Sequence, residues 1–341
     1  MERKSLSRAL GLALALSLLG ANAPSAAVTI ETVPVGNVGN AADTTGYGRV
    51  DYGYNIGKYE VTAGQYTGFL NAVAKTDTYA LYNTAMADTS NGCRIARTGI
   101  PGSYTYTVDQ AFVNRPVNRV SLWDSYRFAN WLHNGQPTGA QGPGTTEDGP
   151  YTLIPPPVEE TLITRNTNWR WAVSSQNEWY KAAYYDPNKS GVGSAGYWMY
   201  PTRSNTAPGR DMTEATNTGN NANHGTGSGP FPIDNGYCTT LVGQFQYSAS
   251  AYGTFDQGGN VWEWIGTAVG EWESMGDWRG ASCGDDEWLL RADNYLFYGV
   301  YPMCEQPYLG FRVCQVPEPT SLGILGLGVV GMLIRRRGAG R

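Results

Sequence analysis

Cys283 has the most reactive side chain in the stretch RGASCGDDEWLLRAD, residues 279–293. A cysteine thiolate is a nucleophile and a soft metal ligand, so this thiol could belong to a reactive site. In an oxidising compartment a disulfide is expected instead, for which Cys304 and Cys314 are the nearest candidates in sequence. A third interpretation, an inert free thiol, also stays open.

Oxygen ligands gather in a second stretch, YGTFDQGGNVWEW, residues 252–264. Its Gly-Gly turn lets the backbone fold so that the carboxylates of Asp256 and Glu263 converge with the carbonyls between them. Ca²⁺ requires six to eight oxygens at about 2.3–2.6 Å. A capped turn with two buried tryptophan rings would give the same pattern, so the motif alone supports both interpretations.

Histidine chemistry is restricted by the sequence. The chain has two histidines, His133 and His224, on distant segments. Iron held by three histidines is therefore impossible within one chain, and a two-histidine site is not expected. We expect His133 to lie exposed at a helix end. The sequence has no GxSxG motif, no P-loop and no HExxH zinc motif.

The first 27 residues predict an exported protein. Arg3, Lys4 and Arg8 precede an apolar run over residues 9–19, and small residues follow as far as Ala27. This order is that of a secretory signal peptide, and the apolar run is too short to span a membrane. We expect signal peptidase to cleave after Ala27; a buried N-terminal helix is the alternative.

The mature chain, residues 28–316, is expected to be one domain that folds where disulfides can form. Its five cysteines allow at most two intramolecular bridges; they are Cys93, Cys238, Cys283, Cys304 and Cys314. The net charge of −5 and the charged fraction of 16% provide no basic surface for a nucleic acid. The 44 glycines, 23 tyrosines and 11 tryptophans predict a loop-rich fold in which aromatic rings supply the buried area.

Three hydroxyl residues predict helix starts because each precedes an apolar pattern of helical period, namely Thr62, Ser121 and Ser175. Glu178 completes a capping box with Ser175 for a helix over residues 176–184, and Gly135 ends the helix that Ser121 begins. Short strands are expected over residues 55–60 and 169–173, and residues 186–229 should be irregular.

The C-terminal segment, residues 317–341, resembles the PEP-CTERM sorting tail of Gram-negative bacteria. Pro317, Glu318 and Pro319 precede an apolar run over residues 322–334, which ends at Arg335 to Arg337. The resemblance implies transient anchoring in the inner membrane by residues 322–334 and removal by an exosortase. The protein would then reach the cell surface or the extracellular matrix.

The domain between these signals resembles the formylglycine-generating enzyme, or sulfatase-modifying factor, family from about Tyr54 to Cys314. Six motifs occur in order: NIGKYEVTAGQY, RPVNRVSLWDSYRFANWL, SSQNEWYKAAYYDP, GNVWEW, RGAS and GFRV. The resemblance implies an irregular α+β fold that is related to the C-type lectin fold and has little regular secondary structure.

The resemblance also implies two structural Ca²⁺ sites. The first would use the side chains of Asp256 and Glu263 and the carbonyls of Gly259 and Val261. The positions that best match the second are Asn223, His224, Asp234 and Gly236, and Asn221 could replace Asn223.

Oxidases of the family bind copper(I) through two cysteines that follow the arginine-glycine motif. Those positions fall here on Asp285 and Leu290, which cannot replace thiolates on copper(I), so we do not expect copper. Trp262, Ser282, Asp285 and Arg291 are the candidate binding residues of the same cleft, and Arg291 is expected in a structural ion pair.

Three hypotheses for the function follow. The first is a calcium-braced module at the cell surface that binds a glycan or a protein of the extracellular matrix. The second is a formylglycine-generating oxidase that acts on an exported substrate. The third is another enzyme in the same cleft, with Asp285, Asp286 or Glu287 as an acid or base.

Overall fold

The computed structural model describes residues 27–158, 163–213, 219–226, 233–234, 236–266, 276–294 and 300–316. In these residues the helices are α1 (Ala63–Val73), α2 (Leu122–His133) and α3 (Gln176–Tyr184), with the short turns η1 (Thr84–Ala87), η2 (Pro143–Glu147) and η3 (Glu287–Leu290). The strands are β1 (Thr32–Val35), β2 (Tyr54–Gly57), β3 (Ile95–Thr98), β4 (Thr105–Val108), β5 (Trp171–Val173), β6 (Tyr185–Asp186), β7 (Gly196–Tyr197), β8 (Trp262–Ile265), β9 (Asp277–Arg279), β10 (Leu309–Phe311) and β11 (Val313–Gln315).

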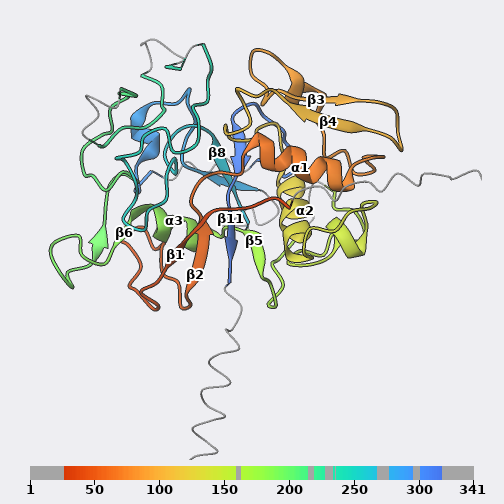
Figure 1. The fold of residues 1–341 in the computed structure, drawn as a ribbon. Coiled ribbons are helices and arrows are strands. Elements are labelled where there is room, and N and C mark those ends of the chain that lie inside the picture. Colours follow the sequence, from red (N-terminus) through yellow and green to blue (C-terminus); the bar gives the residue numbers. More distant parts are fainter. Residues whose placement is uncertain are drawn as a thin grey trace, which may run out of the picture.

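Two small sheets organise the molecule. The larger has the order β1-β2-β11-β5, so the last strand of the domain lies between strands from its first two hundred residues (Figure 1). The second has the order β10-β8-β9, with β10 parallel and β9 antiparallel to β8. Since β10 and β11 are separated by one residue, Arg312, the chain passes directly from one sheet to the other. The fold is therefore α+β and rich in loops.

Each main helix begins with a capping box, which the sequence predicts at Ser175, while it predicts N-caps alone at Thr62 and Ser121. Thr62, Ser121 and Ser175 each accept a hydrogen bond from the backbone N–H three residues on. The side chain at that later position accepts in return from the capping residue's own N–H, so two otherwise unpaired donors are satisfied. The predicted strands also form, as β2 and β5, with shorter bounds than expected.

Aromatic rings fill the core between α1, α2 and the sheets. Phe128 on α2 lies against Phe69 of α1 and Phe311 of β10, with ring centroids 5.3 Å from each. Tyr126 stacks on Tyr151 with centroids 3.7 Å apart. These rings supply the buried area that the few long helices cannot, as the composition predicts.

His133 differs from its prediction. It is the last residue of α2, but it is half-buried, and its Nδ1 accepts the backbone N–H of Arg170 at 3.0 Å. Burial lowers the pKa of this imidazole. The ring therefore serves to join α2 to the start of β5, which helical periodicity could not reveal.

The predicted signal peptide up to residue 26 and the predicted sorting tail, residues 317–341, lie outside the described residues. Within the described part of the chain, no helix has both the length and the apolar character needed to cross a membrane.

Candidate ligand-binding site and cation sites

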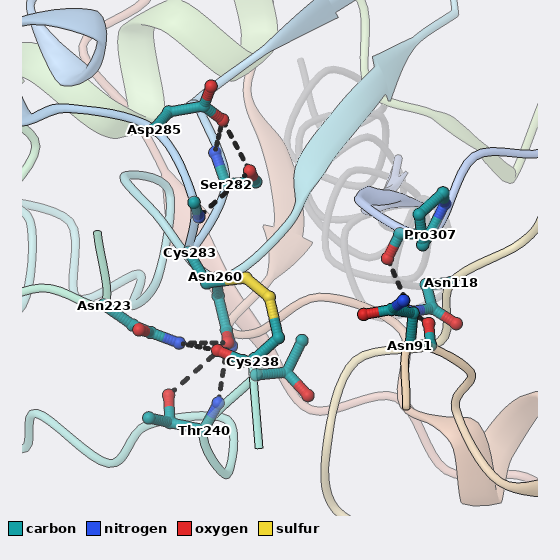
Figure 2. Close-up of a disulfide and its surroundings, with 12 residues drawn as sticks. Asn91, Asn118, Asn223, Cys238, Thr240, Asn260, Ser282, Cys283, Asp285 and Pro307 are labelled. Carbon is teal, nitrogen blue, oxygen red and sulfur yellow. Dashed lines mark hydrogen bonds between the residues drawn. A yellow bond between two sulfur atoms is a disulfide. The ribbon is translucent and has the colours of Figure 1, made fainter. Parts of the chain in front are cut away.

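Cys283 forms a disulfide with Cys238, 45 residues earlier in the chain (Figure 2). A disulfide is one of the expected outcomes, but neither of the partners nearest in sequence is used. Cys314 lies buried on β11, where its Sγ is 3.4 Å from a carboxylate oxygen of Glu178. The fold thus holds Cys314 at the large sheet, and it brings the loop that contains Cys238 to Cys283.

Asn260 is the centre of the hydrogen bonds around this disulfide (Figure 2). Its backbone N–H donates to the carbonyl of Asn223 at 2.8 Å, and its own carbonyl accepts from the N–H of Cys283 at 3.0 Å. Its Oδ1 accepts from Asn223 Nδ2 at 3.1 Å and from the N–H of Thr240 at 2.9 Å. The backbone and side chain of one buried residue, Asn260, therefore join the loops that contain Asn223, Thr240 and Cys283.

Asp285 organises the start of the candidate binding site. Its Oδ2 accepts Trp262 Nε1 at 2.8 Å, the N–H of Ser282 at 2.8 Å and the Ser282 hydroxyl. No hydrogen bond within the described part of the chain falls on Oδ1 of this half-buried residue. The structure thus unites three of the four predicted binding residues and leaves one carboxylate oxygen available.

Arg291 and Leu290 have other environments. Arg291 pairs with Asp293 at 2.6 Å on the surface, which agrees with the expected ion pair. It also lines a small hollow with Trp262 and Trp278. Leu290 is fully buried, and its carbonyl accepts the hydroxyl of Tyr184 at 3.0 Å. The second position at which an oxidase would hold copper is therefore a core position here.

Aromatic rings lie beside Asp285. The rings of Trp262 and Trp278 have centroids 5.9 Å apart, and Tyr308 meets Trp278 edge-on at 6.3 Å. We call these three residues the aromatic cluster. Tyr308 is 37% exposed, and Trp288, three residues after Asp285, is 48% exposed. Sequence reasoning missed Trp278 and Tyr308, because they come from β9 and from the loop before β10.

The first predicted cation site is partly occupied by a buried ion pair. Arg312 donates to both carboxylate oxygens of Glu263, with a shortest distance of 2.8 Å, and Trp179 Nε1 adds a hydrogen bond at 2.8 Å. Asp256 lies nearby, and its Oδ2 accepts the N–H of Gly243 at 2.6 Å. Burial raises the pKa of Asp256 to about 6.

Glu60 is a third carboxylate in this region, which sequence reasoning missed. It is 2% exposed, and neither of its oxygens has a hydrogen-bond partner among the described residues. Burial and the charge of Asp256 raise its pKa well above the ordinary value. Burial thus favours the protonated forms of Glu60 and Asp256, whereas a cation bound between them would favour their charged forms. The signal in the sequence was an acidic residue between the apolar Tyr59 and Val61.

The second predicted site contains another buried oxygen without a partner. Asn223 is 1% exposed, and its Oδ1 has no hydrogen bond within the described residues. Asn221, the alternative ligand, uses its Oδ1 to accept the N–H of Asp211 at 2.9 Å. The ring nitrogens of His224 lie within hydrogen-bond distance of backbone carbonyls, which leaves its own carbonyl as the candidate ligand.

Asp234, the acidic member of the second site, pairs with Arg115 at 2.6 Å. Gly236 follows in the same turn with a φ of +84°, and Tyr237 donates its N–H to the Asp234 carbonyl. In the described residues, no group of three or more His, Cys, Asp or Glu side chains is placed to hold a metal. A cation at either site would therefore depend on carbonyl and amide oxygens as well, which suits Ca²⁺.

The protein is an irregular α+β domain whose GNVWEW, arginine-glycine and GFRV segments meet at one disulfide-linked region. The family model described as "Sulfatase-modifying factor enzyme 1-like domain" matches residues 29–316, and the chain belongs to that family. A PEP-CTERM protein-sorting motif matches residues 315–337, which supports export to the cell envelope of a Gram-negative bacterium.

Solved structures with similar folds have low sequence identity to this chain. The "Crystal Structure of CarF" is 21% identical, covers 85% of this chain and 100% of its own, and has a TM-score of 0.46. Treponema denticola variable protein 1 is 17% identical over 84% and 95% of the two chains, with a TM-score of 0.49. PvdO from Pseudomonas aeruginosa is 17% identical over 85% and 92%, with a TM-score of 0.43. No curated protein matches the chain.

Proposed function

We propose that this exported protein is a calcium-braced module that binds a glycan of the extracellular matrix and is not a thiol oxidase. The observation that carries the proposal is the arrangement at Asp285. This carboxylate stands where an oxidase would hold its first copper cysteine, and it orients Trp262 beside an exposed tyrosine.

The chemistry of the site suits a sugar. Ligand sites combine apolar and aromatic walls with a few placed polar groups. The aromatic cluster offers ring surface on which the apolar face of a pyranose can stack, and Asp285 Oδ1 can accept a sugar hydroxyl. Since three hydrogen bonds already hold Oδ2, the carboxylate enters the complex with its orientation fixed.

Copper-dependent oxidation is not supported by the residues at hand. Copper(I) selects soft thiolates, whereas the two positions carry a carboxylate and a buried leucine. The one thiol of this segment, Cys283, is consumed by the disulfide. The hydrogen bonds on Asp285 also suit it to a positioning task better than to the acid or base of a different enzyme.

Calcium is proposed for both predicted sites because the chain buries oxygens there without partners. Asn223 Oδ1 would serve one site, with the His224 carbonyl and Asp234. Asp256 and Glu60 would serve the other, while Glu263 remains paired with Arg312. When bound, the ion would neutralise the buried carboxylates and fix the surrounding loops.

A glycan-array screen followed by calorimetry on the exported chain tests the binding proposal. Asp285→Ala and Tyr308→Ala should each weaken binding of the selected glycan by about tenfold, which is the size of one lost stacking or charged hydrogen-bond contact. Tyr247→Ala is a matched control, since Tyr247 is exposed but lies outside the aromatic cluster. Equal losses in all three variants would contradict the assignment, and selection of a protein ligand alone would replace the glycan by a protein.

The oxidase alternative has its own test. The purified chain, supplied with copper(I) and a cysteine-containing sulfatase peptide, should consume no oxygen and leave the peptide thiol intact. Formation of an aldehyde on the peptide would overturn the proposal.

Calcium is tested separately by chelation. Removal with EGTA should lower the melting temperature, and added Ca²⁺ should restore it, because an ion that binds only the folded state stabilises that state. Glu60→Gln should reduce the calcium-dependent increase while the chain stays folded in its absence. A melting temperature indifferent to chelator would contradict both cation sites.

A further inference from the structure

The start of the described chain is held by an unusual pair of contacts. The backbone nitrogen of Val28 donates to Gln136 Oε1 at 2.7 Å, and Gln136 Nε2 donates to the Val28 carbonyl at 2.8 Å. One side-chain amide thus pairs with both polar groups of one residue, 108 positions away. Ala27, immediately before it, is exposed.

The backbone at Gln136 has a left-handed conformation just after the end of α2. Gln136 has a φ of +59°, a left-handed conformation that is strained for a non-glycine residue and needs support from its surroundings. Its N–H donates to the carbonyl of Trp131 at 2.9 Å, so it closes the last turn of α2. The two hydrogen bonds to Val28 help to hold Gln136 in this conformation.

The Val28 side chain also has a fitted position. It lies over Gly68 on α1, where an added Cβ would come within 2.7 Å of Val28 Cγ2. Further along, the carbonyl of Thr29 accepts Gln65 Nε2 at 2.8 Å, and β1 then pairs with β2. The chain is thus tied to the body from Val28 onward.

The electrostatic surroundings favour a positive charge at this point. The C-terminal ends of α1 and α2 meet here, because the loop after α2 returns the N–H of Gly139 to the carbonyl of Ala72. Helix C-termini carry partial negative charge, which attracts a cation. A small hollow beside Gln136 is also lined by Arg170, whose backbone N–H donates to His133. The positive charge of Arg170 would partly offset the attraction of a cation to this point.

We propose that Val28 is the N-terminal residue of the mature protein and that Gln136, between the ends of α1 and α2, is a binding site for its α-ammonium group. Hydrolysis of the Ala27–Val28 peptide bond consumes one water. Ala27 keeps the water oxygen in its new carboxylate, and the Val28 nitrogen takes up both protons of the water, so its N–H becomes an ammonium group. The hydrogen bond to Gln136 Oε1 thereby becomes charge-assisted and stronger than that of the uncleaved amide. Removal of the signal peptide thus completes the fold. This inference does not depend on the proposed ligand.

The first experiment identifies the terminus. The full chain is exported from a Gram-negative host, and intact mass with N-terminal sequencing should give Val28 as the first residue. A mature chain that begins at Pro24, or at any residue other than Val28, would overturn the proposal.

The second experiment measures the site. A succinimidyl ester at pH 7 should acylate the Val28 amine about tenfold more slowly than in Gln136→Ala, the ratio expected for one charge-assisted hydrogen bond. Gln110→Ala, at an exposed glutamine, is the matched control and should react like the parent chain. Equal rates in the parent and Gln136→Ala would contradict an ammonium site.

A third variant guards against failure of Gln136→Ala to fold. Gly-Ser inserted between Ala27 and Val28 moves the ammonium group away from Gln136 and leaves the body unchanged. It should lower the melting temperature by about 2–4 °C, and adding Gln136→Ala to it should have less effect than in the parent. No change on insertion, or strictly additive effects of the two changes, would sink the proposal.

Discussion

Gly259 illustrates how one residue decides the geometry of the disulfide region. Its φ is +88°, and an added Cβ would lie 2.1 Å from the Asn223 carbonyl oxygen, far inside van der Waals contact. The same Asn223 carbonyl accepts the N–H of Asn260, so it cannot retreat without breaking that hydrogen bond. The Gly-Gly turn, for which the sequence left a metal loop and a capped turn open, is therefore required by this backbone contact.

Gly259→Ala should destabilise the protein by about 2–4 kcal/mol, because it adds backbone strain and breaks the Asn223–Asn260 contact. Urea unfolding measures the change. Gly36→Ala is the matched control, since an added Cβ at Gly36 meets nothing within 4 Å. Similar losses in the two variants would show that the close approach does not constrain the turn.

Buried Asp124 and half-buried Glu305 give a second prediction at the scale of residues. Burial raises the pKa of Glu305 to about 8, and the charge of Asp124 adds to the effect. Burial likewise raises the pKa of Asp124 to about 6. Because both values lie above those of the unfolded chain, the folded state binds more protons between about pH 4 and pH 8, and stability falls as the pH rises through this window.

The pH effect can be measured by thermal melting from pH 4 to pH 9. Glu305→Gln should flatten the decline on the side nearest pH 8, since the amide keeps hydrogen-bonding capacity and cannot ionise. A melting temperature that rises over this interval, or an unchanged slope in Glu305→Gln, would contradict the assignment.

At the scale of elements, the capping boxes fix where the helices begin and hence where their side chains point. α3 begins after Ser175, whose hydroxyl accepts the N–H of Glu178. Glu178 pairs in turn with Arg165 at 3.1 Å, while Trp179 of the same helix donates to Glu263. The start of α3 thereby positions a ring that supports the first cation region.

Ser175→Ala should cost about 1 kcal/mol, the usual loss for removal of an N-cap, and should leave the bounds of the other helices unchanged. Denaturant unfolding followed by circular dichroism provides the value. Ser190→Ala, at an exposed serine with no side-chain hydrogen bond in the described residues, should change stability by less than about 0.5 kcal/mol. If Ser175→Ala lost no more unfolding free energy than Ser190→Ala, the capping box would not stabilise α3.

At the scale of the whole molecule, the Cys238–Cys283 disulfide joins segments that neither sheet connects. It closes a loop of 45 residues that contains Asp256, Glu263 and the GNVWEW strand. Constraint of the unfolded chain by a loop of this length is worth about 4 kcal/mol in the chain-entropy model. The disulfide is thus a covalent brace in the same loop as Asp285.

Cys238→Ser combined with Cys283→Ser should therefore lower the free energy of unfolding by about 2–4 kcal/mol and weaken calcium binding, because Asn223 donates to the Cys238 carbonyl at 2.8 Å. Unfolding of the parent chain with and without reductant provides a parallel measurement. A loss below about 1 kcal/mol, with calcium affinity unchanged, would show that hydrogen bonds around Asn260 hold the region unaided.

The sequence by itself determined the local features of this protein. Helix starts at Thr62, Ser121 and Ser175 depend on contacts within three residues, so their capping patterns predicted them correctly. The ordered motifs likewise led to the family and the sorting motif that the comparisons confirm. Only the tertiary structure decided the partner of Cys283, the burial of Glu60 and the grouping of Trp278 and Tyr308 with Asp285. Each of these depends on which distant loops meet, and loops without regular periodicity leave no trace of their neighbours in the sequence.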